Sequence, residues 1–299
     1  MRPLRIGTRG SALALWQART VAALLAREGR TSELVTIRTE GDRIQDRPLS
    51  ETGGKGLFVK EIEDALLART IDVAVHSAKD MSVAVPAGLA VAAVLPREDA
   101  RDALVLRPGE MLAASPAVGT GSVRRSAQLA ARMPSARFTP IRGNVDTRLR
   151  KLDAGEYDAL VLAVAGLKRL GYASRISEAI PHEECIPAPC QGIIAIETRL
   201  EDAGQDVWSA LTDGETAAAF AAERALVEAL GGGCQLPLGA IAVHEGQELA
   251  MRAIVTTPDG ARRVRRAARG DAARPAELGR RLADELARGG AIDILNSLR

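Results

Sequence analysis

The sequence predicts an α/β protein: two α/β domains followed by a small α+β domain with a three-stranded antiparallel sheet. The first observation is a repeated strand–helix pattern, in which short aliphatic runs alternate with apolar residues at helical spacing. The second is a change at Glu215, after which a helix, three strands joined by tight turns and a closing helix follow. We expect domain 1 to comprise residues 1–95 and 191–210, domain 2 residues 96–190, and domain 3 residues 214–299.

Composition excludes several classes of protein. The 299 residues are 46% apolar with only seven aromatics, so the cores must be built from small aliphatic side chains. No apolar run approaches the roughly 20 residues that a membrane helix needs, and the N-terminal residues lead into a strand rather than a signal peptide. Three cysteines fit a reducing compartment, so we expect a cytoplasmic protein with no membrane partner. A net charge of +2 and few aromatics argue against nucleic-acid binding.

Domain 1 begins with a strand over 4–8, a helix that Ser11 can cap, and a second strand over 34–39. The first connecting loop brings the Arg9 guanidinium, the Ser11 hydroxyl and free N–H groups to a helix N-terminus, which suits a carboxylate or phosphate. Residues 53–56, a glycine-rich stretch containing Lys55, lead into a predicted helix with Phe58, Ile62, Ala65 and Leu66 on one face. This stretch lacks the spacing of a phosphate-binding loop, so we predict no nucleotide site there.

A buried strand over 71–75 ends in a polar segment, His76 to Asp80. Ligands of open α/β sheets bind beyond the carboxyl ends of strands, so Ser77, Lys79 and Asp80 are placed for chemistry. Asp80 is the candidate acid/base or cation-stabilising group. The alternative is a structural ion pair with Lys79, although adjacent side chains of an extended segment point to opposite faces.

A strand over 89–95 and a returning strand over 191–197 complete domain 1, and domain 2 repeats the pattern with strands over 103–106 and 158–163. Loops 119–122 and 142–144 open helices that carry Arg124, Arg125 and Arg148. Between residues 120 and 169 there are ten basic and four acidic residues. Arginines and N-terminal amides suit carboxylates, so we expect anion sites here. His182, Cys185 and Cys190 lack the spacing and the fourth ligand of a metal site, so no metal is predicted.

Domain 3 is predicted to hold strands over 239–244, 248–256 and 262–268, with the arginine-rich run 262–266 on a solvated edge. Its helix ends at three glycines, 231–233, directly before Cys234. Glycines let a bulky group approach the thiol, as a covalent attachment point requires. The alternative is a helix C-cap followed by a small buried cysteine.

Along its whole length the chain resembles the hydroxymethylbilane synthase (porphobilinogen deaminase) family. The motifs that carry the resemblance are T-R-G-S at 8–11 with L-A-L-W-Q at 13–17, G-G-K-G-L-F at 53–58, H-S at 76–77 with K-D at 79–80, R-E-D at 97–99, R-R at 124–125, R-G-N-V at 142–145 with T-R-L at 147–149, A-G-L-K-R-L-G at 165–171, Q-G at 191–192 and G-G-C-Q at 232–235. The family resemblance implies two periplasmic-binding-protein-like α/β domains, which agrees with the repeated strand–helix pattern.

The resemblance also implies the reaction. Four porphobilinogen molecules are joined into a linear tetrapyrrole with release of ammonia, on a dipyrromethane cofactor held by a thioether to Cys234. Asp80 would stabilise positive charge on the pyrrole nitrogen and assist proton transfer. The implied cofactor-binding residues besides Cys234 are Ser77, Lys79, Thr120, Ser122, Arg124, Arg125, Arg142, Gly143 and Asn144. The implied substrate-binding residues are Arg9, Ser11, Gln17, Lys55, Phe58, Arg148, Arg169 and Gln191. We expect a monomer.

Some positions depart from the family pattern: Glu51, Ala78, Ser82, Gly121 and Cys190. Gly121 lacks a hydroxyl for contact, Glu51 reverses a charge near Lys55, and Cys190 adds a thiol. The sequence also leaves open a different class of function, namely a non-catalytic two-lobed protein that binds a polycarboxylate. Such a protein would have no use for a cysteine after three glycines.

Overall fold

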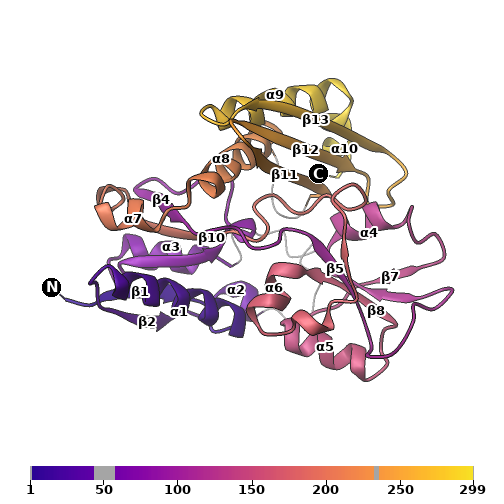
Figure 1. The fold of residues 1–299 in the computed structure, drawn as a ribbon, viewed down its shortest axis with the longest axis horizontal. Helices are drawn as coiled ribbons and strands as arrows, with labels where there is room; N and C mark the ends of the chain where they lie inside the picture. Colours follow the sequence, from indigo (N-terminus) through magenta and orange to yellow (C-terminus); the bar gives the residue numbers. More distant parts are fainter. Residues whose placement is uncertain (1, 44–57, 232–235, 299) are drawn as a thin grey trace. The chain divides into compact units, whose positions relative to one another are not determined.

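The computed structural model describes residues 2–43, 58–231 and 236–298. By their contacts these residues form two units (Figure 1). Unit 1 holds the described residues up to 98 together with 193–217, and unit 2 holds 99–192 and the described residues from 218 onward. Lys55, Cys234 and Glu51 lie outside the described residues. The bounds of the three predicted domains stay predictions.

Unit 1 is built on a five-stranded sheet in the order β2-β1-β3-β10-β4. The first three strands of this order are parallel, and β10 runs antiparallel to both of its neighbours. The strands are β1 (Leu4–Thr8), β2 (Ser32–Thr36), β3 (Val73–Ser77), β4 (Leu89–Val94) and β10 (Ile194–Arg199). The helices are α1 (Ala12–Arg27), α2 (Glu40–Arg43), α3 (Lys60–Leu67) and α7 (Asp206–Leu211), with short 3₁₀ turns η2 (Ala78–Asp80) and η4 (Leu200–Asp202).

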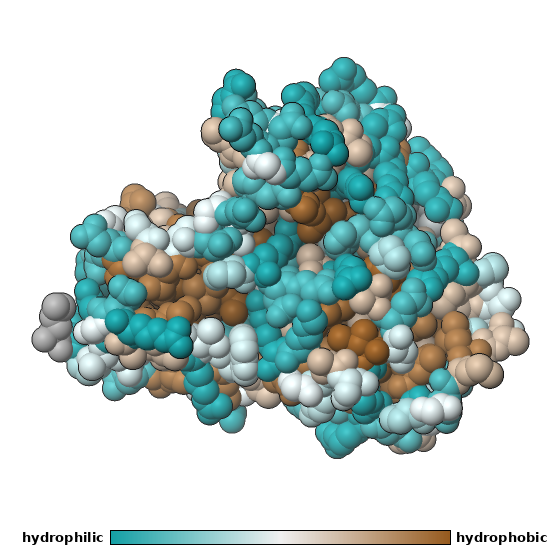
Figure 2. Space-filling model, viewed as in Figure 1, coloured by the Kyte–Doolittle hydropathy of each residue, from teal (hydrophilic) through white to brown (hydrophobic). Residues whose placement is uncertain are grey.

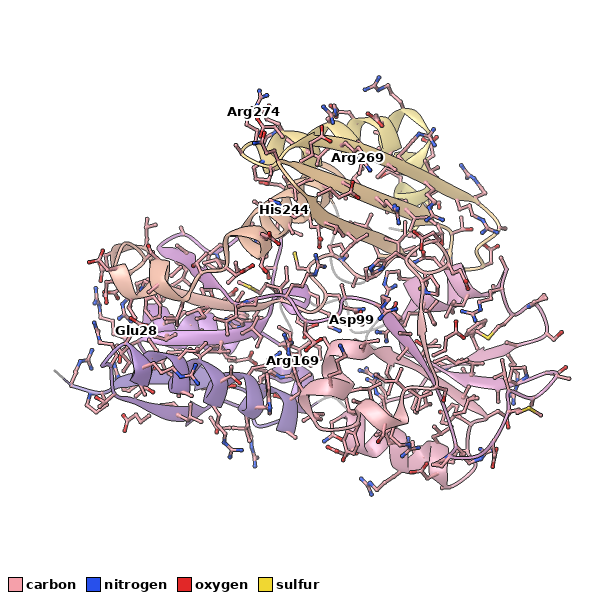
Figure 3. The ribbon with its side chains drawn as sticks, in the orientation of Figure 1. Glu28, Asp99, Arg169, His244, Arg269 and Arg274 are labelled. Carbon is pink, nitrogen blue, oxygen red and sulfur yellow. The ribbon has the colours of Figure 1, made fainter. Side chains whose placement is uncertain are left out.

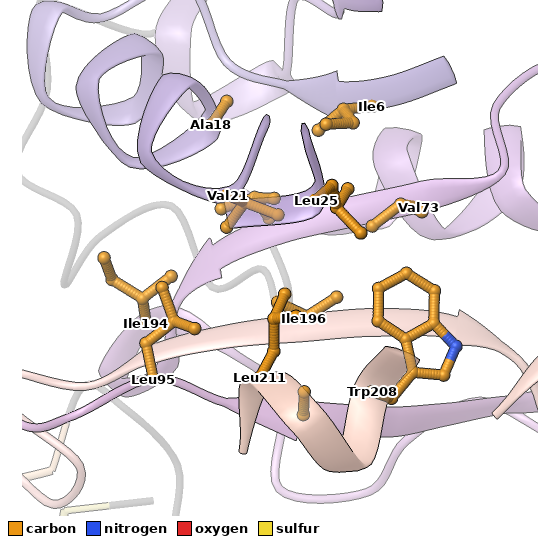
Figure 4. Close-up of a cluster of buried hydrophobic side chains, with 12 residues drawn as sticks. Ile6, Ala18, Val21, Leu25, Val73, Leu95, Ile194, Ile196, Trp208 and Leu211 are labelled. Atoms are coloured by element: carbon orange, nitrogen blue, oxygen red, sulfur yellow. The ribbon is translucent and has the colours of Figure 1, made fainter. Parts of the chain in front are cut away.

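The core of unit 1 lies between α1, α7 and one face of this sheet (Figure 4). Ala18, Val21 and Leu25 recur at helical spacing on α1 and are fully buried, as the sequence predicts. They pack in one cluster with Ile6 of β1 and Trp208 of α7. Ser11 caps α1, because its Oγ accepts the Ala14 N–H at 3.3 Å. The loop between β1 and α1 is thereby fixed.

Unit 2 contains a second sheet with the same order and the same strand directions, β7-β6-β8-β5-β9. Its strands are β5 (Asp102–Leu106), β6 (Ala117–Gly119), β7 (Arg137–Thr139), β8 (Ala159–Ala163) and β9 (Glu178–Ile180). Its helices are α4 (Val123–Leu129), α5 (Val145–Asp153) and α6 (Val164–Arg169), with η3 (Ala173–Arg175). In each sheet the antiparallel strand, β10 or β5, follows a segment of chain that comes from the other unit.

The C-terminal part of unit 2 contains α8 (Gly214–Ala229), which begins in unit 1, and an antiparallel sheet of β11 (Leu238–Glu245), β12 (Glu248–Thr256) and β13 (Arg263–Asp271). Helices α9 (Pro275–Arg288) and α10 (Ala291–Asn296) pack against it. Hydrophilic side chains cover the region of α9 and β13 in Figure 2. Strand β13 is an edge with exposed Arg263, Arg265 and Arg266, as expected. The predicted fold class of two α/β domains and an α+β domain is confirmed.

Several strands differ in their bounds from those predicted, and polar residues account for three of these differences. The second strand spans 32–36 instead of 34–39, because its polar first residues pair with β1 at the edge of the sheet. Strand β3 starts later and includes His76 and Ser77. Strand β10 continues through Thr198 and Arg199, which are buried although they are polar. In each case a hydrogen-bonded polar residue extends a strand that hydropathy alone would end.

Candidate active site

Asp80 ends the short turn that follows β3. Ala78 donates its N–H to Ile193 O at 3.0 Å, which extends the pairing with β10 by one residue, and Met81 closes the turn by donating to Ala78 O at 3.2 Å. The Asp80 side chain is half-buried. Within the described part of the chain, no hydrogen bond or ion pair engages its carboxylate, and the alternative of an ion pair with Lys79 is not formed. Backbone contacts therefore fix the turn that carries Asp80.

Four further predicted residues of unit 1 meet in two pairs. Gln17, which is buried on α1, donates from Nε2 to Ser77 Oγ at 2.9 Å. Arg9 lies over the Phe58 ring, with the guanidinium carbon 4.1 Å from the ring centroid. The Arg9 guanidinium also binds Asp42, from Nε at 3.1 Å and from Nη2.

Asp42 was not predicted. Burial alone would raise the pKa of its carboxyl, but the hydrogen bonds and charge of Arg9 outweigh burial, and the pKa is lowered. Thr39 adds a hydrogen bond to the same carboxylate at 2.8 Å. Asp42 follows the second strand, whose end was predicted wrongly, and lies in a charged stretch of the sequence. No feature of the sequence distinguishes it from the other acidic residues there. The charge of Arg9 is thus largely balanced within unit 1.

Unit 2 contains a cavity of about 280 Å³ at the N-termini of α4 and α5. The volume is near the lower end of the range for small-molecule sites. Predicted cofactor and substrate residues line it: Thr120, Ser122, Arg125, Arg142 and Arg148. Its described lining includes no carboxylate.

Gly143 and Asn144 do not line this cavity but fix Arg148 beside it. Asn144 caps α5 by accepting the Thr147 N–H at 2.9 Å. Gly143 has a φ of +107°, and a Cβ at this position would come within 2.7 Å of the Thr147 side chain, so only glycine fits the turn. The Gly143 carbonyl accepts from Arg148 Nε at 2.8 Å. These contacts orient the guanidinium of Arg148.

The cavity is electropositive. Burial, followed by the charges of Arg125 and Arg142, lowers the pKa of Arg148 to about 10. Among the residues that the structure describes, none gives Arg148 a carboxylate partner. A bound anion would relieve both the desolvation of Arg148 and the repulsion from its neighbours. The donor set therefore fits a ligand that carries carboxylates.

Arg124 and Arg125 are buried and share one partner, Asp102. Arg124 Nη1 lies 2.8 Å from Asp102 Oδ2, and Arg125 Nη2 lies 2.7 Å from Asp102 Oδ1. Burial disfavours the Asp102 anion, but the charges of Arg124 and Arg125 outweigh it and hold the pKa of this carboxyl far below its usual range. Gln191 also binds Asp102, at 2.8 Å. The sequence analysis missed Asp102, although an acid at the head of an apolar strand is a usable signal.

The remaining predicted residue, Arg169, lies at the end of α6 (Figure 3). Its Nη2 donates to Gly192 O at 2.6 Å, next to Gln191 in the chain. In the described residues, no group of three His, Cys, Asp or Glu side chains could hold a metal ion. Cys185 lies instead against Asp102 and Arg124, where burial first of all raises the pKa of its thiol to about 12.

Two models of protein families match the chain. Residues 4–206 match the model described as "porphobilinogen deaminase, dipyromethane cofactor binding domain", and residues 217–288 match "porphobilinogen deaminase, C-terminal domain". The chain belongs to the porphobilinogen deaminase family. Porphobilinogen deaminases, or hydroxymethylbilane synthases, are enzymes of tetrapyrrole biosynthesis, and the chain is therefore such an enzyme with a dipyrromethane cofactor.

Solved structures similar to this chain include three solute-binding proteins. A second substrate-binding domain of a putative amino acid ABC transporter from Streptococcus pneumoniae is 12% identical, with a TM-score of 0.44 over 77% of this chain and 95% of that one. A putative methionine-binding lipoprotein from Bacillus subtilis is 11% identical, with a TM-score of 0.41 over 70% and 88%. The periplasmic aliphatic sulphonate binding protein from Escherichia coli is 15% identical, with a TM-score of 0.40 over 76% and 70%. Similarities this weak do not bear on what porphobilinogen deaminases bind.

Across residues 2–43, 58–231 and 236–298, no helix combines the length and the apolar character needed to cross a membrane.

Proposed function

We propose that the protein joins four porphobilinogen molecules into hydroxymethylbilane, with release of ammonia, on a dipyrromethane attached to Cys234. The observation that carries this proposal is the electropositive cavity around Arg148, whose described lining contains no carboxylate. Porphobilinogen and dipyrromethane both carry acetate and propionate groups, which match such a lining. The proposal includes the monomeric state and cytoplasmic location that the sequence predicts.

Arg148, Arg142 and the hydroxyl groups of Thr120 and Ser122 would hold carboxylates by charge-assisted hydrogen bonds. Each such pair fixes direction as well as distance, so the pyrrole rings would be oriented by their acidic arms. The dipyrromethane, when bound, supplies the pyrrole carbon to which the first substrate is joined.

Asp80 would act on the substrate. Its carboxylate has no partner in the described residues and would stabilise the positive charge that develops on the pyrrole nitrogen as ammonia leaves. The same carboxylate could accept a proton from the ring after the new carbon–carbon bond forms. Asn at this position would keep the shape of the side chain but lose both functions.

The anchor is tested by the mass of the intact protein. We expect the purified protein to exceed the mass of its sequence by one dipyrromethane, and Cys234→Ala to lack this excess. Cys190→Ala is the matched control, because Cys190 is buried and its backbone N–H is bonded to Glu223. Excess mass that persists in Cys234→Ala and disappears in Cys190→Ala would show that the thioether is at Cys190, contrary to the proposal. If no sample shows excess mass even after incubation with porphobilinogen, the proposed function is wrong.

A further inference from the structure

Beneath the Asp80 turn, a buried histidine and a buried glutamate join β3 to β10. His76 Nε2 lies 3.0 Å from Glu197 Oε2, and the side chains are 3% and 0% exposed. The other oxygen, Glu197 Oε1, is buried with no hydrogen-bond partner among the described residues. An ionisable pair in such a place is costly to bury, and it persists only where its geometry is supported from several sides.

His76 lies two residues before the turn that carries Asp80. In the antiparallel register, His76 is opposite Ala195 and Ser77 is opposite Ile194. The His76–Glu197 contact therefore crosses the two strands diagonally, on one face of the sheet. The next backbone contact along the chain is the Ala78 N–H bond to Ile193 O, and the Asp80 turn follows directly. Whatever separates the end of β3 from β10 must move this turn.

We propose that His76 and Glu197 act as one unit that positions Asp80, by holding the C-terminal end of β3 against β10. The proposal rests on the role of Asp80 in the proposed function. We assign neither residue a chemical step in the reaction. Glu63 on α3 is the third ionisable group in this region. Burial, followed by the charge of Glu197, raises its pKa.

The kinetic test uses Glu197→Leu and His76→Phe in the full-length, cofactor-loaded protein. We expect each variant to lower kcat about tenfold or more while KM for porphobilinogen changes little, since small displacements of a reacting group are costly. Glu197→Gln keeps an acceptor for His76 and should recover most of the lost kcat. If the two residues act as a unit, the double variant loses no more than either single variant. A double variant whose loss is the product of the two single losses contradicts the proposal.

Asp72 provides the matched control at the opposite end of the same strand. It is buried directly before β3, where it accepts hydrogen bonds from Arg5 at 3.0 Å. Asp72→Asn should reduce thermal stability as Glu197→Leu does, yet leave kcat within about twofold, because β3 separates it from Asp80 by five residues at about 3.3 Å each. An equal loss of kcat in Asp72→Asn would mean that general destabilisation, rather than positioning, explains the effect.

Hydrogen exchange supplies a readout independent of turnover. In Glu197→Leu we expect faster exchange of the Ala78 and Met81 amides, which close the turn, and unchanged exchange at Val73, which pairs with β1. Uniform acceleration across β3, or none at Ala78, contradicts positioning.

The background Asp80→Asn separates the two proposals. If Glu197 acts through Asp80, adding Glu197→Leu to Asp80→Asn causes no further loss of kcat. A further loss of the full tenfold would overturn the positioning role while the role of Asp80 stands. Normal kcat in Asp80→Asn alone would overturn the role of Asp80 itself, and with it the basis of the positioning role.

Discussion

Arg125 donates two hydrogen bonds to a single oxygen of Asp102, from Nε at 2.9 Å and from Nη2 at 2.7 Å. Its remaining nitrogen, Nη1, donates to Val161 O at 3.1 Å, so every nitrogen of this guanidinium is engaged. Arg124 occupies the other oxygen of Asp102. Two cations thus share one buried anion, and the excess positive charge lies next to the cavity that Arg125 lines. The roles of Arg124 and Arg125 in cofactor binding stay predictions.

Asp102→Asn should lower the free energy of unfolding by about 3 to 5 kcal/mol, because two buried guanidiniums lose their counter-charge. Urea denaturation at pH 7 measures this change. Since folding lowers the pKa of Asp102, its stabilising effect is present above about pH 4 and is lost as the pH falls further. Glu110→Gln, which breaks an exposed pair with Arg107, is the control and should have little effect on stability. A loss below about 1 kcal/mol in Asp102→Asn would contradict this account.

Glu63 should make the protein less stable as the pH rises from 4.5 to about 7. Burial, followed by the charge of Glu197, raises the pKa of Glu63 from 4.5 to about 7. Its contribution to stability is complete below pH 4.5 and is lost as the pH rises to about 7, a change of about 2 to 3 kcal/mol. Glu63→Gln should remove this dependence and be the more stable protein at pH 8. Unfolding curves from pH 4.5 to 8 that are parallel for both proteins would show that Glu63 ionises normally.

Gly279→Ala should have two opposing effects on stability, one from helix propensity and one from packing. Alanine in the middle of α9 should favour the helix by about 1 kcal/mol. However, a Cβ at residue 279 would lie 2.1 Å from Ala222 O on α8, so the two helices must separate. We expect net destabilisation of about 1 to 3 kcal/mol, measured by thermal unfolding. Gly204→Ala, where the Cβ meets nothing within 4 Å, should have little effect. Stabilisation by Gly279→Ala would show that α8 and α9 are not packed as described.

Much of the fold follows from periodicity. The α1 positions Ala18, Val21 and Leu25 are buried as their spacing requires, and the antiparallel C-terminal sheet follows from its turns. Strand ends could not be predicted where polar residues are buried, as at Thr198 and Arg199, because their partners are distant in sequence.

Part of the candidate site could likewise be predicted from the sequence, and part could not. The clustering of Arg142 and Arg148 at helix N-termini could be predicted from local motifs. Asp102 and Asp42 could not be assigned as partners of arginines, because the pairs join residues 23 and 33 positions apart. Only the folded chain shows which arginines are paired with carboxylates of the protein.

Arg148→Gln should weaken binding of the acidic substrate, raising KM for porphobilinogen about tenfold or more, because a charge-assisted contact in the cavity is lost. Steady-state kinetics of the cofactor-loaded variant measures this change. Arg150→Gln is the matched control on the same helix, since Arg150 is exposed and bonded only to Thr147 Oγ1 among the described residues. Equal effects of the two substitutions would indicate a general electrostatic attraction and no specific site at Arg148.

The central claim is that the Asp80 carboxylate performs the chemistry, and the turnover of Asp80→Asn tests it most directly. The variant should retain the full mass of the cofactor-loaded protein, so that any defect lies after attachment of the dipyrromethane. We predict that its kcat for porphobilinogen consumption falls by about 10² or more, the scale of losing a positioned acid/base group. A fully loaded Asp80→Asn protein with kcat within about threefold of the parent would contradict the account.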